Sequence, residues 1–221
     1  MRAAFHAELA ELISQLASMV RLAGEMMTNA SIALHQADLA LAALVIADQA
    51  RIGAMYRALE RRCITLLALE APVAGDLRVV VTALHALVHA QRMGNLARHV
   101  AMIARFKRPN PMTSARVRPV LARMSLLTSQ LAADAATAIE YQDPLSGCRL
   151  AVADDEVDAL HRHLFAILFA EDWSHGVEQA VDAALIGRYY ERFGDHAVAI
   201  ARGVCYRVTG ELSAGTLSDN R

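Results

Sequence analysis

The chain of 221 residues is long enough for one large domain or two small ones, and its 55% hydrophobic content is sufficient to bury a core. Aromatic residues make up only 5% of it and alanine supplies much of the apolar content, which is typical of closely packed helices. The formal net charge of -1 argues against a general electrostatic attraction to nucleic acid or anionic membranes.

Cysteine usage and the N-terminal segment indicate a cytoplasmic protein. Cys63, Cys148 and Cys205 are far apart in the sequence and form no C-x-x-C pair, so neither a disulfide framework nor a zinc ribbon is expected. Charged residues interrupt the N-terminal helical pattern, which is unlike a signal peptide. The longest uninterrupted apolar run, Leu39 to Ala47, is about half the ~20 residues that a membrane-spanning helix needs. We therefore expect no membrane span.

Apolar residues recur at helical spacing along most of the chain and predict six long helices. Asp38, Asp76 and Asp143 can cap the second, third and fifth helices, and Ser174 can open the sixth, which ends near Gly210. The expected helices are 5–34, 38–69 and 76–106 in the first half, and 113–141, 143–170 and 174–209 in the second.

The two halves of the chain resemble each other. Two prolines within residues 107–111 interrupt the helical pattern at the middle of the chain. Displacing the sequence by 100 residues aligns Q-R-M-G-N-L-A at 91–97 with E-R-F-G-D-H-A at 191–197. We therefore predict an all-α protein of two tandem three-helix bundles, 1–108 and 112–210, followed by a frayed tail over 211–221.

Two carboxylates lie one helical turn apart in the second of these motifs. Glu191 and Asp195 lie on one stripe of the sixth helix. Two like charges at this i,i+4 spacing repel each other by about a few tenths of a kcal/mol unless a counter-charge lies close. Arg188 and Arg192 each precede one of them by three residues and could neutralise the pair. A bound metal ion is the alternative.

The metal alternative needs further carboxylates from a neighbouring helix. Asp154 and Asp158, four residues apart on the expected fifth helix, can supply them. Four oxygen ligands without cysteine favour magnesium, manganese or iron over zinc. Such an ion would hold the fifth and sixth helices together, whereas the arginine alternative predicts that the bundle folds without metal.

Four segments together resemble the PhoU family of phosphate-uptake regulators, whose actinobacterial members are often called PhoY. The resemblance covers about residues 5–209, and the duplicated E-R-x-G-D element is its most specific part. The segments are E-R-F-G-D-H-A at 191–197, Q-R-M-G-N-L-A at 91–97, P-V-A-G-D-L-R at 72–78 and D-D-E-V-D-A-L-H at 154–161.

The resemblance implies a function based on protein contact. PhoU-like proteins are homodimeric negative regulators in the cytoplasm, which connect the ATPase of the high-affinity phosphate transporter to the sensor histidine kinase of the phosphate-starvation regulon. Through these partners the protein would be recruited to the inner face of the membrane. Some relatives also hold metal clusters on E/D-x-x-x-D pairs from adjacent helices.

Carried over residue by residue, the family's metal ligands are present in the second bundle only. Asp154, Asp158, Glu191 and Asp195 match the acidic pairs, so a divalent metal is expected there or not at all. In the first bundle the corresponding positions are Gln91 and Asn95, with Gly53 near the position of Asp158, and these are weak ligands for a hard cation. We therefore expect no metal cluster in the first bundle.

Two other classes of protein are alternatives to the regulator. A carboxylate-bridged di-metal enzyme requires Glu-x-x-His elements, which this sequence lacks, and it also has no Gly-rich phosphate loop. Catalysis is therefore disfavoured. A helical-bundle protein that only binds or stores metal is compatible with the spacing, but so few acidic pairs argue against storage.

Overall fold

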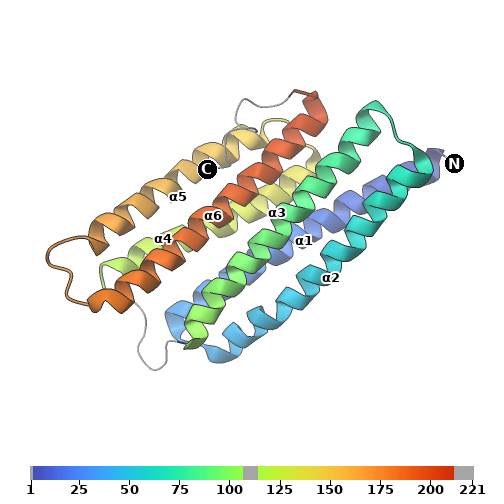
Figure 1. Ribbon diagram of the computed structural model, residues 1–221. Coiled ribbons are helices and arrows are strands. Elements are labelled where there is room, and N and C mark those ends of the chain that lie inside the picture. The colour runs from blue at the N-terminus through green and yellow to red at the C-terminus, as the bar shows by residue number, and fades with distance from the viewer. Residues whose placement is uncertain (1, 107–113, 212–221) are drawn as a thin grey trace.

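The protein is built from six α-helices, as seen in the computed structural model, which describes residues 2–106 and 114–211 (Figure 1). Every regular element in those two ranges is an α-helix, which confirms the predicted all-α class. The helices are α1 (Arg2–Gln36), α2 (Leu39–Glu70), α3 (Ala74–Phe106), α4 (Val117–Tyr141), α5 (Ser146–Leu168) and α6 (Gly176–Thr209).

The helices form two three-helix bundles that lie side by side. α2 packs against α1 and α3, and α5 packs in the same way against α4 and α6. The bundles meet where α1 contacts α4 and α3 contacts α6, so α2 and α5 lie on opposite sides of the molecule (Figure 1). The predicted pair of three-helix bundles is thus confirmed.

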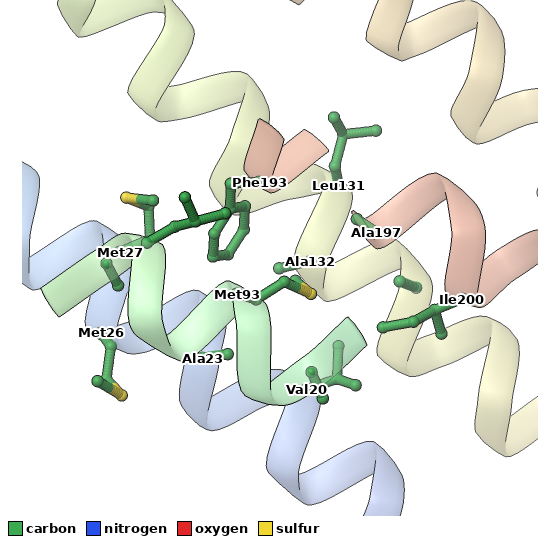
Figure 2. Close-up of a cluster of buried hydrophobic side chains, with 14 of the residues drawn as sticks. Val20, Ala23, Met26, Met27, Met93, Leu131, Ala132, Phe193, Ala197 and Ile200 are labelled. Atoms are coloured by element: carbon green, nitrogen blue, oxygen red, sulfur yellow. The ribbon is translucent and has the colours of Figure 1, made fainter. Parts of the chain in front are cut away.

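One hydrophobic core runs through both bundles. Figure 2 shows Met27 of α1, Met93 of α3, Ala132 of α4 and Phe193 of α6 in a single buried cluster. Met93 and Phe193 occupy equivalent positions in the two copies of the repeat, and both are 0% exposed. Because the four central helices contribute to the same cluster, we expect the two bundles to unfold together.

Small and polar residues set the close contact between the bundles. A Cβ atom at Gly24 of α1 would lie 2.9 Å from the Cβ of Ala132 of α4, so the missing side chain lets these helices approach. The hydroxyl groups of Ser31 on α1 and the fully buried Tyr190 on α6 share a 2.8 Å hydrogen bond. Burial raises the pKa of Tyr190 to about 12 and keeps the phenol neutral.

The predicted helix starts are right for α2 and wrong by a few residues elsewhere. The Asp38 carboxylate accepts hydrogen bonds from the backbone N–H groups of residues 40 and 41, both at 3.0 Å, and caps α2 as expected. α3 begins at Ala74, so Asp76 lies inside its first turn, where a negative charge still complements the helix dipole.

The later boundaries differ for a local reason. The carboxylate of Asp143 accepts a 2.9 Å hydrogen bond from the backbone N–H of Leu145. This bond closes a turn in front of α5, so the helix begins at Ser146. α6 begins at Gly176 rather than at Ser174, and its expected end at Gly210 is confirmed by a left-handed φ of 76°. α4 begins at Val117. The expected Pro-rich junction over 107–111, the start at 113 and most of the tail over 211–221 lie outside the described residues.

α2 is more apolar than its uninterrupted runs suggest. By length and composition alone it could cross a membrane, with an 18-residue window of mean hydropathy 1.3. Only 17% of that window is buried in the protein, so α2 presents much of its apolar surface outward. It nevertheless packs along α1 and α3 as part of the first bundle.

Candidate functional site

Four carboxylates gather between α5 and α6, and we call Asp154, Asp158, Glu191 and Asp195 the acidic seam. Gly194 of α6 makes this arrangement possible, because a Cβ atom there would overlap Oδ1 of Asp154 on α5. At Gly187, two turns earlier on α6, the side chain of Leu164 of α5 likewise fills the space that a Cβ atom would take. The two glycines thus let α5 settle closely onto α6.

Electrostatic repulsion dominates the acidic seam. Burial, followed by the charges of Asp195, Asp158 and Glu191, raises the pKa of Asp154 to about 7. Burial and the charge of Asp195 likewise raise the pKa of Glu191, against the opposing effect of Arg188. The charges of Asp158 and Asp195 thus act on both Asp154 and Glu191 and favour the protonated form of each.

Arg188 supplies part of the counter-charge that the sequence predicted. Its Nη1 donates to Oε1 of Glu191 at 2.5 Å, although Arg188 is half exposed while the Glu191 carboxylate is mostly buried. The other oxygen of Glu191, Oε2, and Oδ1 of Asp154 are buried and have no hydrogen-bond partner among the residues that the structure describes. One arginine therefore satisfies only one edge of the seam.

The chemistry of the acidic seam suits a hard divalent cation, while its present geometry is not closed around one. Buried carboxylate oxygens without partners, with raised pKa values, are what Mg²⁺ or Mn²⁺ would stabilise. Within the described ranges, however, no three histidine, cysteine, aspartate or glutamate side chains converge as a metal-holding group.

The equivalent place in the first bundle holds neutral side chains, and we call Gln49, Gly53, Gln91 and Asn95 the neutral seam. Gln49 Nε2 of α2 donates to Asn95 Oδ1 of α3 at 2.7 Å. Gly94 again allows a close approach, since a Cβ atom there would lie 3.1 Å from the side chain of Ile52 and 3.3 Å from Gln49 Oε1. Gln49 was missed by the sequence reasoning, although a displacement of 105 residues places it on Asp154.

A second polar feature lies where α3 meets α6. Nδ1 of His89 is 3.1 Å from Nδ1 of His196, and the ring of His99 stacks on Tyr189 with centroids 5.2 Å apart. Burial, His89, Arg192 and Arg92 lower the pKa of His196 to about 4, so its imidazole is neutral at physiological pH. His89 thus contacts α6, and sequence patterns do not predict such contacts between bundles.

These features define a duplicated helical-bundle protein with one acidic and one neutral seam. The model of the family described as the PhoU domain matches the chain twice, over residues 16–104 and 121–204. The chain belongs to the PhoU family, and as a member of it is an accessory and regulatory protein rather than an enzyme.

Individual relatives match along almost the whole chain. The protein is 44% identical to the phosphate-specific transport system accessory protein PhoU homolog 2 of Mycobacterium tuberculosis, over 95% of this chain and 99% of the relative. It is 43% identical to PhoU homolog 1 of Mycobacterium leprae, over 96% of each. The crystal structure of PhoU from Pseudomonas aeruginosa superposes with a TM-score of 0.86 at 28% identity, covering 94% of this chain and 100% of that one.

Proposed function

We propose that this protein is a negative regulator of phosphate uptake and of the phosphate-starvation regulon. In this role it connects the ATPase of the high-affinity phosphate transporter to a sensor histidine kinase when phosphate is plentiful. The observation that carries the proposal is the 44% identity, over 95% of the chain, to a protein named as a phosphate-specific transport system accessory protein. A solved relative from Streptococcus pneumoniae is named a phosphate transport system regulatory protein.

The regulatory role is tested by capture of its partners. The tagged protein should retain the transporter ATPase and the cytoplasmic portion of the kinase, and should not retain the ATPase of an unrelated transporter. Deletion of the gene should leave phosphate-starvation genes expressed in high phosphate, and reintroduction should silence them. If neither partner is retained and transcription is unchanged, the proposal is wrong.

The proposal also includes where the protein acts and in which assembly. We expect a cytoplasmic homodimer that is recruited to the inner face of the membrane through its partners. Analytical ultracentrifugation of the purified protein should give twice the 23.9 kDa mass of one chain. Fractionation should place the protein with membranes only when the transporter is present. A monomer at micromolar concentration contradicts the first expectation.

A second proposal concerns the acidic seam, in which we infer a divalent cation such as Mg²⁺, Mn²⁺ or Fe²⁺. The buried oxygens of Asp154 and Glu191 that lack partners support it. Elemental analysis of protein purified without chelator should find metal in the wild type and not in Glu191→Gln plus Asp195→Asn. The control, Asp155→Asn plus Glu171→Gln, removes two exposed carboxylates and should keep the metal. Equal content in all three proteins contradicts the proposal.

A further inference from the structure

A hollow of about 220 Å³ opens between α3 and α6, and three arginines are among the residues that line it. Arg92 of α3 and Arg188 and Arg192 of α6 line it, together with His99, His196 and Asn95. Arg92 and Arg192 occupy equivalent positions in the two copies of the repeat. The hollow therefore lies where the two E/Q-R-x-G-D/N elements face each other.

The positive charge of this hollow is poorly compensated. No acidic side chain of the described residues is among those that line it. Neither Arg92 nor Arg192 forms an ion pair with any residue that the structure describes, and Arg188 binds Glu191, which lies outside the lining. The guanidinium groups of Arg92 and Arg192 line the same small space and repel one another, and an anion between them would relieve that repulsion.

Asn95 lines the hollow and also belongs to the neutral seam. Its Oδ1 accepts from Gln49, which leaves the amide Nδ2 to donate toward a ligand. In the second copy the equivalent residue is Asp195. An aspartate at position 95 would place a carboxylate in the lining and oppose the binding of an anion. The neutral first copy thus keeps the hollow cationic.

The size and the donors of the hollow define the class of ligand. Its volume is several times the ~30 Å³ that a water molecule occupies in the liquid. It is below the range of about 300–1,000 Å³ that is usual for sites holding drug-sized molecules. Guanidinium groups bind phosphate oxygens through pairs of parallel hydrogen bonds. A single tetrahedral oxyanion therefore fits in the hollow.

We propose that the hollow between α3 and α6 binds a phosphate group, held by Arg92, Arg192 and Arg188 with Asn95 and His99 as further donors. The group could come from free inorganic phosphate or from the terminal phosphate of a nucleoside triphosphate whose remainder stays in solvent. Its binding would draw Arg188 away from Glu191 and so connect the hollow to the acidic seam. The site is argued from its own geometry and does not depend on the adaptor role.

The test is a titration of the purified full chain at constant ionic strength, with chloride as the reference anion. Inorganic phosphate in one arm and a nucleoside triphosphate in the other should give saturable heats in calorimetry. Backbone amide signals of residues 92–99 and 188–196 should shift in NMR spectra. The arm with the tighter binding identifies the source of the phosphate group.

Matched variants make the test specific. Arg92→Gln and Arg192→Gln should each weaken binding about ten-fold, the effect of losing one charge-assisted hydrogen-bonded partner, and Asn95→Asp should also weaken it. Arg105→Gln removes an exposed arginine of α3 outside the lining and should change the affinity less than two-fold. Circular dichroism and urea unfolding check that each variant folds. Absence of saturable binding in both arms, or equal loss in Arg105→Gln, overturns the proposal.

Discussion

The two bundles share the same arrangement of helices but hold different side chains at equivalent places, neutral amides in the first and carboxylates in the second. In each, a glycine of the third helix lets the second helix approach closely: Asp154 lies nearest to Gly194, whereas Ile52 and then Gln49 lie nearest to Gly94. In the first bundle the polar group meets a neutral amide, and in the second it meets carboxylates. The first bundle folds with no charge in this place, so packing alone does not require the carboxylates of the second.

This difference separates structural from functional roles. The hydrogen bond between the two amides forms at any pH because neither group titrates, whereas the acidic seam needs a proton, Arg188 or a cation to offset its repulsion. A protein that only needed to join α5 to α6 could use the neutral solution already present in the chain. We therefore interpret the acidic seam as a place that responds to its ionic surroundings.

The largest expected effect tests whether the two copies share one core. Phe193→Ala should lower the free energy of unfolding by about 3–5 kcal/mol, and Met93→Ala by about 2–5 kcal/mol, because both side chains are fully buried. Urea unfolding followed by circular dichroism should show a single transition in each variant. The control Leu126→Ala, at a position 61% exposed, should change stability by less than about 0.5 kcal/mol. Two separate transitions would mean that the bundles unfold independently.

The next largest effect is the pH dependence of stability, which should come from the acidic seam and not from the neutral seam. Asp154 keeps its proton up to about pH 7 in the folded protein but loses it near pH 3.8 when unfolded. The unfolded state therefore releases a proton first, and stability falls as pH rises between these values. With chelator present, Asp154→Asn should stabilise the protein by about 1–2 kcal/mol at pH 8, a figure discounted for solvent screening, and by less at pH 5.

The control for this pH effect is Asp155→Asn, which neutralises the neighbouring, exposed carboxylate of α5. It should leave the difference between pH 5 and pH 8 close to that of the wild type. A loss of stability in Asp154→Asn at pH 8 would show that direct counter-charges, and not retained protons, hold the acidic seam together.

Much of this contrast could be predicted from the sequence. The helical periodicity and the repeat predicted six helices in two bundles, and the alignment of Asn95 with Asp195 predicted that only one seam is charged. Gln49 could have been found by displacing the second helix by 105 residues, whereas the hollow could not have been found from the repeat. Its lining combines α3 and α6, and their relative rotation depends on how the core residues of both bundles pack, which local patterns do not contain.

A smaller effect concerns the arginine that is present in one copy only. Arg188→Gln removes the partner of Glu191, and position 88 in the first copy is a valine. The loss should raise the pKa of Glu191 further and destabilise the protein by about 0.5–1 kcal/mol at pH 8. At pH 5 the loss should be smaller, because Glu191 then carries a proton more often. Urea unfolding at both values measures this.

The matched control is Arg123→Gln, which breaks the ion pair with Glu156, where both side chains are 48% exposed. An exposed pair contributes about 0–1 kcal/mol, and we expect the lower end with little dependence on pH. Equal losses in the two variants would mean that burial of Glu191 adds nothing to the pair.

The smallest effect lies in the neutral seam, where the hydrogen bond from Gln49 to Asn95 replaces the charges. A double-mutant cycle with Gln49→Ala and Asn95→Ala should give a coupling of about 0.5 kcal/mol, the low end for a neutral pair that is partly exposed. The coupling should be the same at pH 5 and pH 8, because neither amide titrates. The exposed pair of Gln130 and Asp134 provides the reference cycle, with a coupling near zero expected. A coupling in the neutral seam that changes with pH would require a titrating group there, and the contrast between the two seams would then fail.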